Sequence, residues 1–204
     1  MKGKLLLLGL GLLSTALLVA LALSWLRTGA EGGNIQATLP DPLAALPSAK
    51  QAYSTLEKWL PSWAEDAVVV AFSTTIERTA KDPAGWTFQV YSPGRQQIAN
   101  VLVEGQQIWV LRELAALYPQ EALPLDNWRV DSDTALKSWW NERGELFWDK
   151  SQTVTVHMGR RPDGGLLWKI TLLNEQGDVI DVHEARGVRS PCGNKRSAVS
   201  GGLV

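Results

Sequence analysis

Two histidines and one aspartate are the side chains of this sequence best suited to binding a metal. His157 lies in one stretch of strand-like residues, and Asp181 and His183 lie two positions apart in another. Alternate residues of a strand share a face, so Asp181 and His183 lie on the same side of their strand. We expect both histidines to point to solvent. If the two strands pair, the three side chains could approach one another and bind a metal weakly. A structural zinc site needs four ligands with Cys/His spacing, which the sequence does not provide.

Nucleophilic catalysis has one candidate, Cys192, in the segment Ser190-Pro191-Cys192-Gly193. A catalytic thiol needs a fixed base and a lowered pKa, and this tail has no apolar periodicity to hold such a site. Outside the cell, the cysteine could instead form an intermolecular disulfide. The serine-nucleophile and phosphate-loop motifs do not occur. We therefore expect no enzyme activity, no catalytic or cofactor-binding residues, no cofactor and no metal.

Tryptophan is unusually abundant, with ten residues against three Phe and three Tyr. These side chains could fill the core, or some could lie at an interface, where an apolar ring with one polar atom is useful. The segment 139–148 suits an interface best, because helical spacing turns one of Trp139 and Trp140 to the core and leaves the other near its edge. We predict a possible protein interface at four residues: Trp139, Trp140, Phe147 and Trp148.

A helix followed by strands is predicted for residues 48–113. Ser48 offers an N-cap, apolar residues recur at helical spacing from Ala49 to Leu60, and Pro61 is expected to end the helix. Four strand-like segments follow, the last two joined by a turn at Glu104-Gly105: 67–76, 86–91, 98–103 and 107–111.

Residues 131–187 repeat this order after a proline-bearing connection at 114–130. Asp131, Ser132 or Asp133 can cap a helix whose apolar residues lie on one side. Strands are predicted at 153–158, 167–173 and 179–183, with turns at 162–165 and 174–177.

The apolar positions of the two halves match at nearly constant spacing. In the strands the spacing is 82 residues, as between Trp86 and Trp168, and in the helices it is 83, as between Ala52 and Ala135. A tandem pair of α+β units explains the match, because each half must lay its helix on one apolar sheet face. Two unrelated helix-and-strand segments are the alternative.

Four segments of the second half carry a family resemblance: Asp131–Leu136, Leu167–Ile170, Asn174–Gly177 and Val179–Val182. Together they resemble a PepSY domain, whose pattern is a capped helix, two strands with an aromatic core, a glycine turn and a closing strand with an Asp. The closing stretch here is Glu184-Ala185-Arg186-Gly187 in place of the usual Thr-Gly-Glu ending. The resemblance covers residues 129–187, and residues 48–113 resemble the family more weakly.

The resemblance implies an exported or membrane-tethered domain without enzyme activity. PepSY-like domains bind proteins or restrain peptidases, and they bring no catalytic residues to assign. The fold expected is therefore α+β, with one or two units of a helix packed on an antiparallel sheet.

An uncharged apolar run from Leu5 to Leu26 predicts where this domain resides. As a helix, the run is about 33 Å long, enough to cross a bilayer. Lys2 and Lys4 precede it, which places residues 1–4 in the cytoplasm and the remainder outside the cytoplasmic membrane. A cleaved secretory signal is the alternative, and the protein would then be secreted. Residues 27–47, rich in Gly, Ala and Pro, read as a tether, and 188–204 as a disordered tail.

Charge and topology limit the partners. The formal net charge of the chain is −1, which gives no reason to expect nucleic acid. We expect contacts with the lipid bilayer and with one or more proteins of the membrane or envelope. The function predicted is a membrane-anchored extracytoplasmic binding or accessory subunit of a larger complex. The alternative is an inhibitor or regulator of an extracytoplasmic peptidase.

Overall fold

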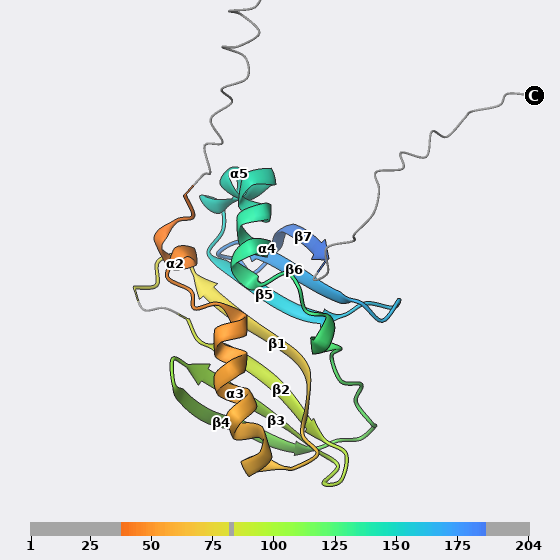
Figure 1. Cartoon of the computed structure of the whole chain (residues 1–204). Coiled ribbons are helices and arrows are strands. Elements are labelled where there is room, and N and C mark those ends of the chain that lie inside the picture. The colour runs from red at the N-terminus through yellow and green to blue at the C-terminus, as the bar shows by residue number, and fades with distance from the viewer. Residues whose placement is uncertain (1–37, 82–83, 187–204) are drawn as a thin grey trace, which may run out of the picture. The chain divides into compact units, whose positions relative to one another are not determined.

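All strands of the described residues belong to one seven-stranded antiparallel sheet (Figure 1). The computed structural model describes residues 38–81 and 84–186. The α+β class predicted from the sequence is confirmed. No helix within these ranges is long and apolar enough to span a membrane. The predicted anchor at 5–26, the start of the tether and the tail at 188–204 lie outside the described residues.

The elements form two successive halves, and in each half the helices come first and the antiparallel strands follow. The first half comprises α2 (Asp41–Ala44), α3 (Ala49–Trp63), β1 (Val68–Glu77), β2 (Trp86–Ser92), β3 (Gln97–Glu104) and β4 (Gln107–Ala115). The second comprises η1 (Leu125–Asn127), α4 (Ser132–Trp139), the π-helical turn η2 (Trp140–Gly144), α5 (Glu145–Trp148), β5 (Thr153–Arg160), β6 (Leu166–Leu173) and β7 (Val179–Arg186).

The two halves share a single sheet because β1 pairs with β5. The strand order is β4-β3-β2-β1-β5-β6-β7, and each neighbouring pair is antiparallel. Helices α3 and α4 lie on the same face of this sheet (Figure 1). We call it the helix face and the opposite one the open face. Alternation along the strands buries residues such as Phe72 and Ile76 on the helix face.

Helix α3 is longer than predicted, because it continues through Pro61 to Trp63. Proline removes the hydrogen bond to the carbonyl group four residues earlier, which here belongs to Glu57. Both residues are exposed, so water can reach the carbonyl group that loses its partner. The position in the last turn limits the damage, since the helix ends two residues later.

Equivalent positions of the two halves meet at the β1–β5 junction. Thr74 pairs with Val156, which is its own counterpart at the spacing of 82 residues. The rings of Trp86 and Trp168, also counterparts, lie 6.0 Å apart. The halves are therefore related by a local pseudo-two-fold axis that passes through this junction. A tandem repeat accounts for this geometry more simply than two unrelated segments do.

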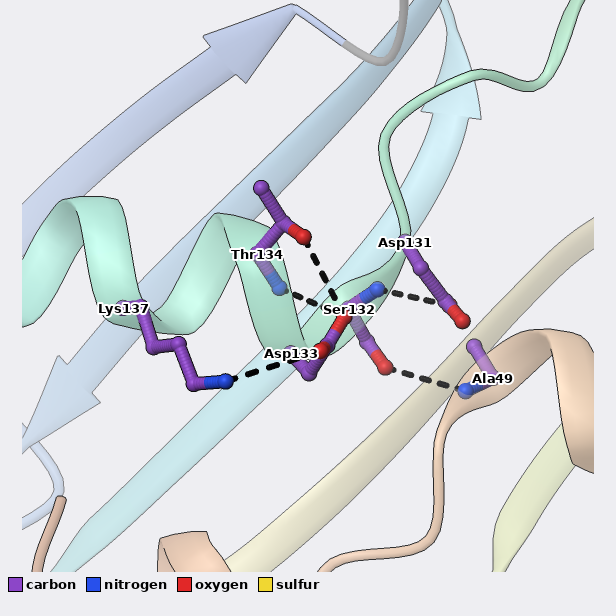
Figure 2. A network of polar contacts seen from close by, with 6 residues as sticks. All are labelled: Ala49, Asp131, Ser132, Asp133, Thr134 and Lys137. Atoms are coloured by element: carbon purple, nitrogen blue, oxygen red, sulfur yellow. Dashed lines mark hydrogen bonds and ion pairs between the residues drawn. The ribbon is translucent and has the colours of Figure 1, made fainter.

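The N-termini of α3 and α4 also meet near this axis (Figure 2). The backbone N–H of Ala49 donates to Oγ of Ser132, 2.9 Å away and 83 residues later in the chain. Asp131 is the N-cap residue of α4, and its Oδ1 accepts from the backbone N–H of Ser132 at 2.7 Å. The same oxygen accepts from Lys50 N–H at 3.2 Å. The N-terminus of α4 thus helps to satisfy two of the free N–H groups of α3.

An aromatic cluster fills the space between these helix ends and the sheet. Its members have ring centroids 5.0 to 6.4 Å apart: Tyr53, Phe72, Trp86, Phe88, Trp128 and Trp168. The indole N–H of Trp86 donates to the Pro47 carbonyl, and that of Trp168 to the Val130 carbonyl, both at 2.8 Å. Each carbonyl lies one residue before the N-cap of its helix, so each indole fixes a helix entry to the sheet.

Replacing Trp86 with Phe is expected to lower the free energy of unfolding by about 2 kcal/mol. The change leaves the Pro47 carbonyl without its donor and a gap in the aromatic cluster. Urea unfolding of the purified chain, followed by circular dichroism, measures the loss. Trp109→Phe is the matched control, because Trp109 is 51% exposed. Equal stability of the two variants would contradict a structural role for the indole bond.

Candidate functional site

The predicted aromatic interface lies in the segment of α4, η2 and α5. Trp139 is fully buried and Trp140 is 8% exposed, so the expectation that one of them lies at the edge is wrong. Trp140 packs edge-on against both Trp139 and Trp148, with centroids 5.9 Å apart in each pair. Phe147 and Trp148 are half-buried, and the exposed apolar residue beside them is Leu146. Of the predicted protein interface, only the residues of α5 remain at the surface, namely Phe147 and Trp148 beside Leu146.

A π-helical turn begins at Trp140, directly after Trp139. A π turn inserts one residue into the helical repeat and rotates the side chains that follow it. Gly144 makes room for the rings, because a Cβ atom there would lie 2.8 Å from Trp140 and 3.2 Å from Trp139. Regular helical spacing, the only periodicity readable from the sequence, does not predict this turn.

A polar cluster surrounds Asp181 on the helix face of β7. Its Oδ1 lies 3.1 Å from Nη1 of Arg143, and its Oδ2 accepts a 3.4 Å hydrogen bond from the indole N–H of Trp139. Nδ1 of His183 lies 3.7 Å from a carboxylate oxygen of Glu142. The His183 side chain is only 11% exposed, and its Nε2 is buried without a hydrogen-bond partner. The expectation that His183 points to solvent is therefore wrong.

His157 lies on the open face, away from Asp181 and His183. Across β6, His157 pairs with Lys169, whereas His183 pairs with the next residue, Ile170. Adjacent residues of a strand point to opposite faces, so the two histidines lie on opposite sides of the sheet. Within the described ranges, no group of three His, Cys, Asp or Glu residues could hold a metal ion. Cys192 lies outside those ranges.

The most unusual surface is the edge strand β4. Four of its apolar residues are between 44% and 57% exposed: Trp109, Val110, Leu111 and Leu114. Leu117 and Tyr118 follow at 83% and 72%. We call these six residues the β4 surface. Clustered exposed apolar side chains on a sheet edge are a frequent site of association. The register of β4 with β3 also shifts between Asn100 and Val101, which leaves Leu111 without a partner in β3.

The other edge strand, β7, is guarded differently. Asp181 and His183 point from β7 toward the helices, and inward charges discourage a further strand from pairing. Strand β4 has one comparable contact, from the Trp63 indole N–H to Glu113, but Glu113 is exposed whereas Asp181 is buried. The sequence predicts a strand at 107–111 but not its place at the edge, because four consecutive apolar residues equally fit a buried strand.

Comparisons of the chain with family models, with curated proteins and with solved structures find no match. The resemblance to the PepSY domain thus rests on the sequence motif alone. The β4 surface and the α5 surface are the protein-binding candidates that the described residues offer.

Replacing Arg143 with Met is expected to lower the free energy of unfolding by about 2 kcal/mol, because it leaves the buried Asp181 carboxylate without its cation. Adding Asp181→Asn should recover much of this loss. Lys137→Met is the control, since it removes only an exposed pair with Asp133, worth less than about 0.5 kcal/mol. Urea unfolding separates these outcomes. An unrecovered double variant would show that Arg143 stabilises the fold by packing alone.

His157 is expected to make the protein less stable in mild acid. Burial, and then repulsion from Lys169, lower the pKa of His157 below its ordinary value. Below about pH 6.5 the unfolded chain therefore binds more protons than the folded one, so stability falls as the pH falls. His157→Gln should lose less thermal stability than the wild type between about pH 7.5 and about pH 5.5. Thr171→Val, on the same face, should keep the wild-type dependence. An unchanged pH dependence in His157→Gln would contradict the assignment.

Proposed function

We propose that the protein is a non-enzymatic binding or accessory subunit, anchored in the cytoplasmic membrane by residues 5–26, that holds a protein partner through its β4 surface. The exposed apolar edge is the observation that carries this proposal. An exported domain with such an edge would associate unless a partner covered it.

The chemistry of the edge favours an extended apolar segment of another protein as the partner. The outer backbone groups of β4 can pair with an added strand, which supplies main-chain hydrogen bonds. Trp109 and Leu114 lie on the open face, paired with Leu102 and Ile98 of β3, so side chains of an added strand would find apolar neighbours. A partner segment with few charges suits the surface, since unpaired charges would be costly there.

The alternative function, restraint of an extracytoplasmic peptidase, is motivated by the PepSY resemblance. This function would use the same edge of β4, which would pair with an extended segment of the peptidase by strand addition. Inhibition of a co-purifying peptidase by the purified chain would favour this function over that of an accessory subunit.

Native membranes solubilised in a mild detergent and separated on native gels test the proposal. The wild-type chain should migrate as part of a larger complex. Leu111→Lys combined with Leu117→Lys should release it, because a charge placed in an apolar interface weakens binding by more than about 2 kcal/mol. Both residues are exposed, so the fold should persist.

Val179→Lys is the matched control, because Val179 is exposed to almost the same extent as Leu111 but lies on the other edge. It should leave the complex intact. Migration of the wild type as a lone monomer in every mild detergent would contradict the proposal. Co-purification of two differently tagged copies of this chain would identify a second copy, rather than another protein, as the partner.

A further inference from the structure

A row of seven paired residues crosses the whole open face of the sheet. The cross-strand registers place one residue of each strand in line, from β4 to β7: Trp109, Leu102, Thr87, Ser73, His157, Lys169 and Glu184. Because helices α3 and α4 cover only the opposite face, this row is open to a ligand over the described part of the sheet.

The centre of the row is hollowed. A cavity of about 250 Å³ lies over β1, β2, β3 and β5, with Ala71 among the residues that line it. Five polar side chains also line it: Ser73, Thr87, Gln89, Asn100 and His157. The volume is below the usual range for sites that enclose a whole small molecule, which is about 300–1,000 Å³. It suits one ring or unit of a longer ligand that lies along the face.

The five polar side chains carry hydroxyl, amide and imidazole groups, and none is a carboxylate or an ammonium. Hydroxyl and amide groups both donate and accept hydrogen bonds. They are half-buried, and the described structure contains no buried unpaired polar atom among them, so their free atoms remain open to a ligand. A ligand that complements these side chains is uncharged and carries many groups that both donate and accept hydrogen bonds.

The position of His157 adds to this match. Its ring lies beside Gly159, where a Cβ atom would be 2.9 Å from Nε2, so the absence of a side chain there gives the imidazole its space. Burial and the neighbouring Lys169 lower the pKa of His157, so the ring stays neutral at neutral pH, with one nitrogen as donor and the other as acceptor.

The ends of the row differ from its centre. Trp109 is 51% exposed at the β4 end, where its ring offers a flat apolar surface for stacking. Lys169 and Glu184 pair directly across strands at the other end, so their charges offset each other. A nucleic acid would need a basic face, which this row is not.

We infer that the open face binds an uncharged carbohydrate chain, with one sugar ring seated in the hollow over Ser73, Thr87, Gln89, Asn100 and His157. The seat in the hollow does not depend on the proposed function, because no residue of the β4 surface lines the hollow, although Trp109 at the end of the row belongs to both surfaces. Hydroxyl-rich rings satisfy the neutral donors and acceptors of the hollow, and the next units of the chain extend along the row.

Isothermal titration of the full chain with cellohexaose and chitohexaose tests the inference, in a detergent that carries no sugar headgroup. An uncharged hexapeptide is the comparison ligand. The wild type should bind at least one of the two oligosaccharides. Gln89→Leu combined with Asn100→Leu should weaken that binding about tenfold, since two hydrogen bonds are worth about 0.5–1.5 kcal/mol each and tenfold is about 1.4 kcal/mol.

Thr171→Val is the matched control, because Thr171 lies on the open face of β6 outside the hollow, and it should change the affinity less than about twofold. The β4 variant Leu111→Lys/Leu117→Lys should bind the sugar normally, and the hollow variant should keep its place in the native complex. Three results would overturn the inference: no binding of either oligosaccharide, equal binding by the double variant, or binding of the hexapeptide alone.

Discussion

The pairing of β1 with β5 is the interaction on which the rest of the structure depends. It turns two helix-and-strand halves into one sheet, and it brings Trp86 against Trp168 where the N-termini of α3 and α4 converge. Without this ladder, each half would expose an edge strand and half of an aromatic cluster. A unit of three or four strands and one helix buries too little surface to be secure alone, so joining the halves supplies a shared core without a disulfide.

The two edges of the sheet differ because the approximate two-fold symmetry fails there. Strand β7 is the counterpart of β3, but only β3 has a further described strand beside it, namely β4. The β7 edge instead holds Asp181, whose carboxylate is satisfied by Arg143 and Trp139. The two edges thus differ in surface, with a cluster of exposed apolar residues at β4 and a buried carboxylate at β7. Equivalent elements can diverge in this way, because the junction and not the edges supports the fold.

The sequence predicts most helices and strands, but it does not predict which elements pack beside one another. The period of two in the strands and the cap at Asp131 are local signals, and the spacing of 82 residues already indicates two related halves. Trp140 is buried at the start of a π turn, and the face of His183 depends on the register between β6 and β7. The exposure of Leu111 depends on β4 being last in the sheet. The last two features arise from long-range pairing, which no local periodicity encodes.

The distribution of polar partners differs between the two faces of the sheet. On the helix face, the described polar groups near the core are largely engaged: Asp131 with backbone N–H groups, Asp181 with Arg143, and the Trp86 and Trp168 indoles with carbonyls. Groups held this tightly stabilise the positions of the helices, whereas Nε2 of His183 on the same face is buried without a partner. The open face and the β4 surface hold the hydrogen-bonding groups and apolar side chains that the fold leaves unused. Because folding leaves these groups exposed, burying them against a ligand or a partner can still contribute to the free energy of binding.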